Sequence, residues 1–251
     1  MKEQNGGYRR LSDLAYSKLR YAISEGQITA GTRLVELELC KTLKVGRTPI
    51  HDALLRLAGD GLVESVPGAG FFVRHLTLED IVMSYEIRIA LESLAIRIAG
   101  QHGFSDMKLM ELERQCNLMD EATRAGDIRA VAQADFHFHQ LIIALAGSPQ
   151  LENAIRSSHL QFLTWSRSMD AGRYLEESRS MGEQHRAIVN HLRARNTAEA
   201  GRLLAQQVRL GLDRRMQEIR ASSQGGSVVE NPKILGEFLD PKNSESSASD
   251  V

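Results

Sequence analysis

The 251-residue sequence has few of the residues that stabilise small secreted proteins or cross membranes. It contains 2 cysteines and 5 prolines, and aromatic residues make up only 5% of the chain. Because Cys40 and Cys116 lie in helical, partly apolar contexts, we expect buried thiols in a reducing compartment. No apolar run approaches the ~18 residues of a spanning helix, and the N-terminus lacks the apolar core of a signal peptide. These absences predict a soluble, cytoplasmic protein that does not enter a membrane.

Charge is distributed unevenly, although the formal net charge is only −1. Residues 1–75 hold 11 Lys/Arg against 8 Asp/Glu, residues 76–221 hold 18 against 19, and residues 222–251 hold 2 against 5. A weakly basic head on a neutral body is compatible with a nucleic-acid reader joined to a second domain, but the asymmetry is too small to establish one. Residues 222–251 are rich in Ser, Gly and acidic residues, which predicts a disordered tail.

Residues 1–75 form the first predicted domain, with three helices followed by a β-hairpin. Apolar stripes at helical spacing mark the helices, and their members include Leu14, Leu19 and Ile23, then Leu39 and Leu43, then Ile50, Leu54 and Leu57. Leu62–Val66 and Phe71–Val73 read as two short strands around the turn formed by Pro67, Gly68, Ala69 and Gly70. Three helices and a hairpin in this order predict a winged helix-turn-helix domain.

Residues 76–221 carry no strand signals and form the second predicted domain. Helix start signals recur along this segment, namely Thr77 with Asp80, Ser105 or Asp106, Asp127, Ser148–Pro149, and Asn196 with Glu199. They divide the segment into about six helices, which predicts an all-helical bundle. The fold class is therefore mainly α.

The start of the third helix is the candidate DNA-reading segment. Pro49 fits the first turn of a helix, where its missing N–H has no partner to lose. Free N–H groups, the Thr48 hydroxyl and Arg47 could together hold a phosphate, or Arg47 could reach a guanine edge. His51 lies one turn beyond Arg47 on the outward side. The other interpretation is a capped core helix with an incidental arginine.

Several motifs in order resemble the reader domain of the GntR family. They are Leu34–Glu36, Val45–Leu54, Arg56–Leu57, Gly61–Val63 and Gly70–Val73. The resemblance implies a homodimer whose recognition helices enter successive major grooves of a near-palindromic double-stranded operator. It also implies DNA contacts from Arg47, Thr48, Pro49, His51 and the wing residue Gly70.

Some residues depart from the usual pattern of that family. Gly46 replaces a serine, His51 an arginine, Asp52 a glutamate and Leu37 an arginine, and Gly68–Ala69 lack the frequent basic residues of the wing tip. Since each bidentate base contact contributes about 1–3 kcal/mol, these changes imply a different operator or weaker binding.

Asp135 and His139 lie four residues apart and so share one face of a predicted helix. Phe138 and Ile142 make that face the buried one, where unpaired polar groups are costly. A divalent metal is one explanation, because Asp with His suits Zn, Mn, Ni or Fe. The alternative is that Asp135 simply hydrogen-bonds to His139 and orients it.

The helical segment is similar to the FCD-type ligand domain of the FadR branch. In that domain an Asp and a His from one helix join two later His residues around a metal. Asp135, His139 and His185 match three of these ligands, whereas Gln207 stands at the fourth position. The resemblance therefore implies a Zn, Ni or Mn site at Asp135, His139 and His185, weakened by Gln207.

Arg88 and Glu92 form an i,i+4 pair on the first helix of the bundle. A structural ion pair is one interpretation. The other, favoured by the resemblance, is that Arg88 binds the carboxylate of a small organic acid or sugar acid, with Gln207 beside it.

Together these features predict a ligand-responsive transcriptional regulator and not an enzyme, with repression relieved by an organic acid. Two alternatives stay open. Asp135, His139 and His185 could form the centre of a metal-dependent enzyme, although no His-Glu-x-x-His motif or phosphate loop is present. The winged helix could instead be an interaction module that no longer binds DNA.

Overall fold

The computed structural model describes residues 2–24, 26–166 and 171–224, which divide into two compact units with the boundary after Thr77. The described chain is mainly α-helical with one small antiparallel sheet, as the sequence predicts. The tail was predicted from residue 222, but the last helix continues through Gln224. Residues 225–251, on which the rest of that prediction falls, lie outside the described residues.

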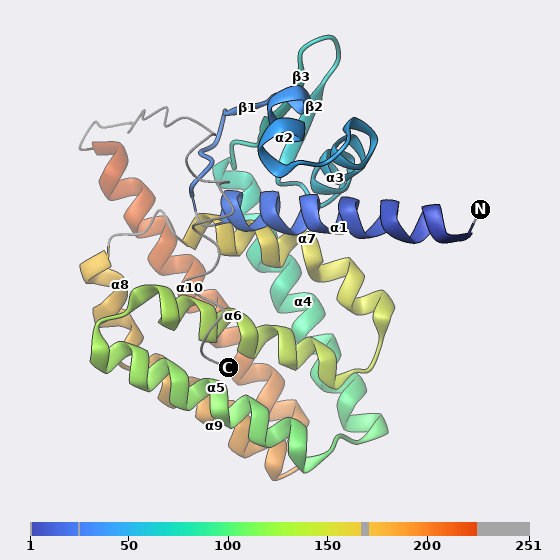
Figure 1. Cartoon of the computed structure of the whole chain (residues 1–251). Helices are drawn as coiled ribbons and strands as arrows, with labels where there is room; N and C mark the ends of the chain where they lie inside the picture. The colour runs from blue at the N-terminus through green and yellow to red at the C-terminus, as the bar shows by residue number, and fades with distance from the viewer. Residues whose placement is uncertain (1, 25, 167–170, 225–251) are drawn as a thin grey trace. The chain divides into compact units, whose positions relative to one another are not determined.

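The N-terminal unit contains the predicted three helices and hairpin (Figure 1). Its elements are α1 (Lys2–Ser24), β1 (Arg33–Leu34), α2 (Glu36–Leu43), α3 (Arg47–Gly59), β2 (Val63–Val66) and β3 (Gly70–Val73). The helix α1 begins well before the apolar stripe that predicts it. The strand β1 was not predicted, because two residues are too short to show a period-2 pattern.

The small sheet has the strand order β1–β3–β2, so the last strand lies in the middle. Leu34 of β1 pairs with Phe71, and Val66 of β2 pairs with Gly70 across the wing turn. Gly68 and Gly70 have φ values of +74° and +100°, which residues with a Cβ rarely adopt. Side chains from all three helices and from β3 form the core of this unit, including Leu19, Ile23, Leu39, Ile50, Leu54, Leu57 and Phe71.

The described part of the C-terminal unit contains seven helices, one more than predicted. They are α4 (Leu78–His102), α5 (Asp106–Ala125), α6 (Ile128–Leu145), α7 (Pro149–Ser166), α8 (Ala171–Ser178), α9 (Met181–Arg193) and α10 (Thr197–Gln224). The additional element is the short α8, which directly precedes α9 and was not separated from it in the sequence. The predicted cap at Asp127 is confirmed, because its carboxylate accepts a hydrogen bond from the Ala130 N–H at 3.0 Å.

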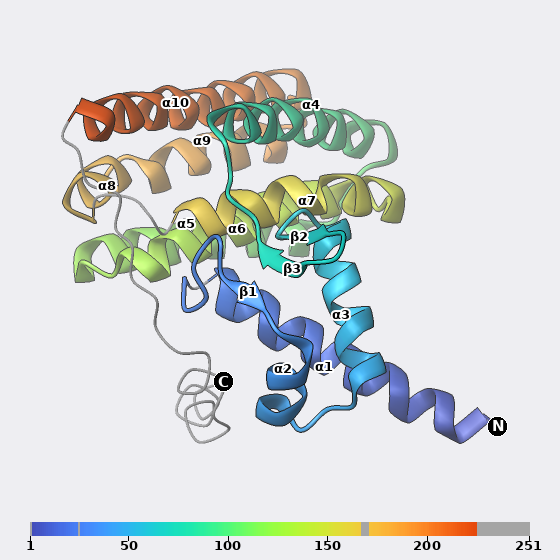
Figure 2. The same cartoon turned by 90° about the horizontal axis from the view of Figure 1, so that it is seen from above.

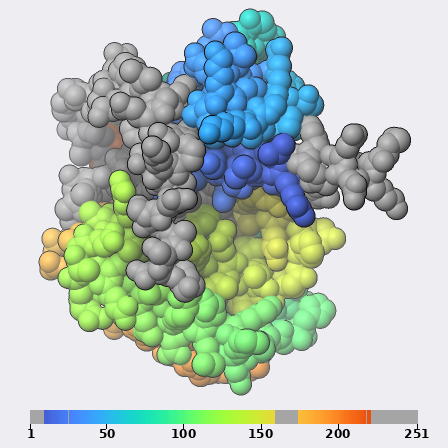
Figure 3. Space-filling view, in the orientation of Figure 1, coloured from blue at the N-terminus to red at the C-terminus, as the bar shows by residue number. Residues whose placement is uncertain are grey.

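The helices of the C-terminal unit pack around a main apolar core, and two smaller apolar clusters lie between α4 and α10 and between α4, α6 and α7 (Figure 2). Helix α4 lies alongside α10, and α5 packs against both α6 and α9. The approach of α9 to α5 is close enough that a Cβ at Gly182 would collide with Asp120. On the face seen in Figure 3, the green and yellow surface of α4 to α7 covers this interior. The buried residues of the core include Leu112, Met119, Phe138, Ile142, Ile188 and Leu204.

Candidate functional sites

The predicted DNA-reading segment forms the exposed N-terminal turn of α3. Gly46 is the N-cap residue and makes no side-chain capping bond, so the first N–H groups of the helix have no side-chain acceptor from this residue. The Arg47 side chain is 85% exposed, and Thr48 is exposed beside it. These groups lie where a phosphate or a base edge could approach.

Glu36 of α2 holds both candidate base-reading side chains. Its carboxylate accepts from Arg47 Nε at 2.9 Å and contacts His51 Nδ1 at 2.7 Å. Because an ionised carboxylate only accepts, His51 carries its proton on Nδ1. The hydrogen bonds from His51 and Arg47 lower the pKa of Glu36 below its ordinary value. His51 also packs edge-on against Phe71 of the wing, with 5.6 Å between ring centroids.

The other predicted DNA contacts differ in exposure. Gly70 is exposed at the start of β3, next to the wing turn. Pro49 is buried in the core of the N-terminal unit, so its side chain has a structural place at the start of α3. The Pro49 backbone has no N–H to donate to a phosphate, so this residue would act on DNA only by shaping the helix start.

The structure brings the three predicted metal ligands together inside the helical unit. Asp135 and His139 come from α6 and His185 from α9, and all three are buried. Asp135 Oδ1 lies 3.1 Å from His185 Nε2 and 3.6 Å from His139 Nε2, and the two Nε2 atoms are 3.4 Å apart. Ligand atoms around a tetrahedral zinc ion would be about 3.4 Å apart, given metal–ligand bonds of about 2.0–2.1 Å.

Both imidazoles are oriented by hydrogen bonds through Nδ1. His185 Nδ1 donates to the carbonyl oxygen of Met181 at 2.7 Å. His139 Nδ1 lies 2.5 Å from Glu92 Oε2 and donates to that carboxylate. These bonds leave both Nε2 atoms facing Asp135, which is the arrangement in which metal-binding histidines occur.

The alternative interpretation of the sequence required a hydrogen bond from His139 to Asp135, and the structure does not contain one. The distance of 3.6 Å between Asp135 Oδ1 and His139 Nε2 is too long for a hydrogen bond. Burial raises the pKa of Asp135, but the two imidazoles hold it below its ordinary value, so the side chain is ionised at neutral pH. Either a proton on one Nε2 or a cation must therefore lie between these three groups.

Arg88 and Glu92 form a buried ion pair on α4, as the first interpretation of this pair predicts. Arg88 Nε donates to Glu92 Oε1 at 2.9 Å, while Glu92 Oε2 contacts His139. Burial opposes the charge of Arg88, but Glu92 and Asp135 raise its pKa above the ordinary value. Burial likewise lowers the pKa of His139, whereas Glu92 raises it, with a net upward shift. The link between Glu92 and His139 was not predicted, because the two residues are 47 positions apart.

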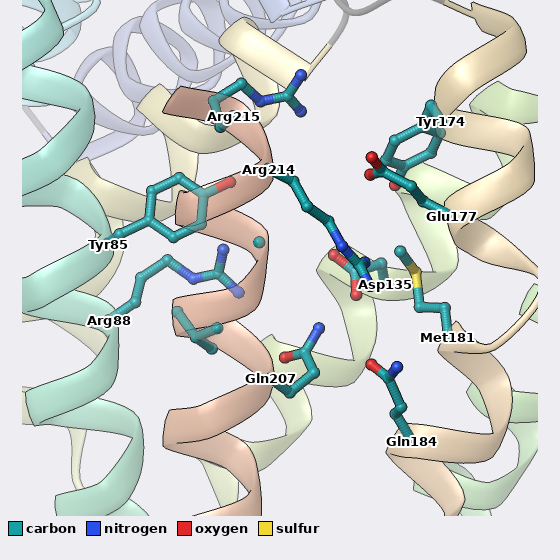
Figure 4. A pocket seen from close by; sticks show the side chains of 12 residues that line it. Tyr85, Arg88, Asp135, Tyr174, Glu177, Met181, Gln184, Gln207, Arg214 and Arg215 are labelled. Carbon is teal, nitrogen blue, oxygen red and sulfur yellow. The ribbon is translucent and has the colours of Figure 1, made fainter. Parts of the chain in front are cut away.

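A pocket adjoins this cluster (Figure 4). Asp135, Arg88 and Gln207 all line it, so the predicted metal and effector residues share one cavity. Among the described residues, Gln207 Oε1 is buried without a hydrogen-bond partner. The sequence did not single out the remaining polar lining residues, Tyr85, Tyr174, Glu177, Gln184, Arg214 and Arg215. Each lies in or beside an apolar stripe of its helix. Sequence spacing there does not distinguish a polar side chain that faces the interior from one that faces solvent.

Comparisons with known proteins settle the family. Residues 11–73 match the family described as "Bacterial regulatory proteins, gntR family", and residues 83–210 match the "FCD domain". The chain belongs to the GntR family and carries an FCD domain. This GntR-family protein is a DNA-binding transcriptional regulator, and its helical unit is of the effector-binding type. Within the described residues, no helix is both long and apolar enough to cross a bilayer.

Two curated relatives and one solved structure illustrate the similarity. The regulator is 29% identical over 196 residues to the "Nta operon transcriptional regulator" of Aminobacter aminovorans, covering 76% of this chain and 88% of the relative. It is 30% identical over 172 residues to the "Probable D-xylose utilization operon transcriptional repressor" of Paenarthrobacter nicotinovorans, covering 68% and 74%. The crystal structure of a GntR transcriptional regulator from Rhodococcus sp. RHA1 is 29% identical, with a TM-score of 0.68 and coverage of 82% and 97%.

Proposed function

We propose that this regulator is a cytoplasmic homodimeric repressor that binds a near-palindromic DNA operator and is released by a small organic acid. Arg47, Thr48, His51 and Gly70 would contact the operator, and Pro49 would fix the first turn of α3 that presents them, because a proline has no N–H to donate to a phosphate. The exposure of Arg47 and Thr48 at a helix N-terminus supports these contacts. A relative named as an operon repressor supports the direction of regulation.

The helical unit would hold a divalent metal ion at Asp135, His139 and His185. The observation that carries this proposal is the convergence of an ionised carboxylate and two Nε2 atoms, each imidazole having its Nδ1 proton engaged elsewhere. A carboxylate with two imidazoles suits Zn, Ni or Mn. Bound there, the ion would act as a Lewis acid toward the oxygen atoms of an effector. Gln207 offers an amide oxygen in place of a fourth imidazole, and we expect it to weaken metal affinity.

The effector would bind in the pocket beside these residues. Arg88 uses Nε for Glu92, and the rest of its guanidinium points into the pocket (Figure 4). A guanidinium in this position can hold a carboxylate of the effector by charge-assisted hydrogen bonds. Gln207 would contribute its buried amide oxygen, which would accept a hydrogen bond from a hydroxyl group of the acid.

Regulation would follow from linkage between the effector pocket and DNA binding. A coupling free energy of about 1–3 kcal/mol changes operator affinity about 5- to 150-fold.

A carboxylate with two imidazoles also occurs in metalloenzymes. We propose a sensor here and not an enzyme, because the family and the named relatives are regulators.

Metal retention by matched histidine variants tests the metal proposal. The protein would be loaded separately with Zn²⁺, Ni²⁺ or Mn²⁺, dialysed, and analysed for bound metal. We expect the wild type to retain about one equivalent of at least one of these ions and His185→Ala to lose it. His191→Ala is the control, because His191 lies on the same helix but outside the cluster, and it should retain the ion. Equal retention by His185→Ala, or no retention by the wild type, would show that the cluster does not bind metal.

A further inference from the structure

The pocket of the helical unit is lined by more positive than negative charge. Three arginines, Arg88, Arg214 and Arg215, face two carboxylates, Asp135 and Glu177, on the lining. The charge of Arg88 is balanced by Glu92 behind the lining, so the formal net charge is +1 for the lining alone and 0 with Glu92. A divalent ion at Asp135, His139 and His185 would increase this value further. Because charge in a pocket is screened less than at the surface, the lining favours an anionic occupant.

The three arginines are not equivalent. Arg88 donates to Glu92, and Arg215 interacts with the hydroxyl group of Tyr85. Arg214 makes no hydrogen bond or ion pair with any part of the chain that the structure describes. Its side chain extends into the pocket from α10, whereas that of Arg88 enters from α4 (Figure 4). A guanidinium in this position can form a bidentate pair with a carboxylate.

We propose that Arg214 binds a second anionic group of the effector, so that the effector is a short acid with two carboxylates. This inference rests on the proposed effector pocket and specifies the class of ligand. One carboxylate would lie toward Arg88 and the metal ligands, and the other would pair with Arg214. The pocket leaves a volume of about 40 Å³, which holds about three water-sized groups without movement of side chains. Even the shortest diacids have more atoms than this, so the lining side chains must move to admit one, and the small volume favours acids of three or four carbon atoms over longer ones.

Matched pairs of hydroxy acids test this specificity. Tartronate differs from lactate only by a carboxylate in place of a methyl group, and malate differs from 2-hydroxybutyrate in the same way. Calorimetric titration of the full-length protein, once loaded with Zn²⁺ and once stripped with EDTA, gives the affinity for each acid. We expect the wild type to bind the diacid at least about 10-fold more tightly than its partner in one of the pairs.

The variant Arg214→Gln should lose this preference to within about twofold while its affinity for the monoacid and its Zn²⁺ content stay unchanged. Arg220→Gln, an exposed position on the same helix, is the control and should behave as the wild type. Three results would overturn the proposal. The wild type could bind both members of each pair equally well, it could bind none of the four acids, or the preference for the diacid could survive in Arg214→Gln. Failure of the metal site is distinguishable, because it would remove Zn²⁺ retention while the preference persists in the stripped protein.

Discussion

The variant Glu92→Gln tests the support of the metal-binding cluster. Glu92 is fully buried and contacts both Arg88 and His139, at 2.9 and 2.5 Å. The amide keeps the shape of the side chain and one acceptor oxygen, but it removes the charge that fixes the His139 proton on Nδ1. We therefore expect His139 to be a weaker and less well oriented ligand in this variant.

The expected loss of metal affinity can be estimated because Glu92 is a hydrogen-bond partner of a proposed metal ligand, His139. Loss of such an outer hydrogen-bond partner typically reduces metal affinity 10- to 100-fold, which corresponds to about 1.4–2.7 kcal/mol. Complete removal of the side chain would also leave Arg88 buried without its ion-pair partner, at a cost of about 3–5 kcal/mol. Glu92→Gln also removes the charge that pairs with Arg88, but its amide oxygen can still accept a hydrogen bond from Arg88, so it perturbs the fold less than Glu92→Ala.

The assay is competitive titration of Zn²⁺ against a chelator, on protein whose fold is checked by circular dichroism. Glu111→Gln, which alters an exposed pair with Arg114 on α5, is the matched control and should bind Zn²⁺ as the wild type does. Imidazole ¹⁵N chemical shifts of the metal-free wild type should also show the His139 proton on Nδ1. Wild-type affinity in a folded Glu92→Gln variant, or a His139 Nδ1 that carries no proton in the metal-free wild type, would refute the reasoning.

Three further predictions concern other parts of the chain. Arg47→Ala should weaken dimer binding to a selected operator about 30-fold or more, as expected for loss of one base contact of about 1–3 kcal/mol in each of two half-sites, and leave acid binding unchanged; gel-shift titration checks this, and equal operator affinity would contradict it. Cys116 is buried as expected, whereas Cys40 is only half-buried. Burial raises the pKa of Cys116 to about 12, so its thiolate fraction at pH 8 is about 10⁻⁴; a thiol reagent should label Cys40 alone in the native protein and both cysteines after denaturation, and rapid labelling of both in the native state would be inconsistent with this. Gly182→Ala should break the ion pair between Asp120 and Arg186, because its Cβ would displace the Asp120 carboxylate, and loss of such a pair at the surface costs about 0–1 kcal/mol; a crystal structure of the variant checks this, and an intact pair would contradict it.

Periodicity and short motifs were sufficient to predict the general architecture. The stripe through Leu39 and Leu43 and the apolar positions of α3 predict a helix-turn-helix, and the glycines around the wing turn predict the hairpin. The i,i+4 spacing of Asp135 and His139 places both on the buried face of α6. Each of these features depends on residues only a few positions apart, so the spacing along the sequence is enough to predict it.

Contacts between distant segments could not be predicted in the same way. The bond between Glu92 and His139 joins α4 to α6, and the spacing along the chain says nothing about it. Nothing in the sequence around Glu36 indicated a special role, yet its carboxylate accepts hydrogen bonds from both Arg47 and His51. The family resemblance implied that Pro49 contacts DNA, and only the packing of the N-terminal unit shows that its side chain is buried. Helix packing determines these partners.

Selection of wild-type and Arg47→Ala protein from a random pool of DNA duplexes tests the central claim most directly. At low salt, the wild type should enrich an inverted repeat whose half-site centres are about 34 Å apart, while Arg47→Ala should lose the base preference at one position of each half-site. Enrichment of no sequence by the wild type, or of the same repeat by both proteins, would contradict operator recognition through the start of α3.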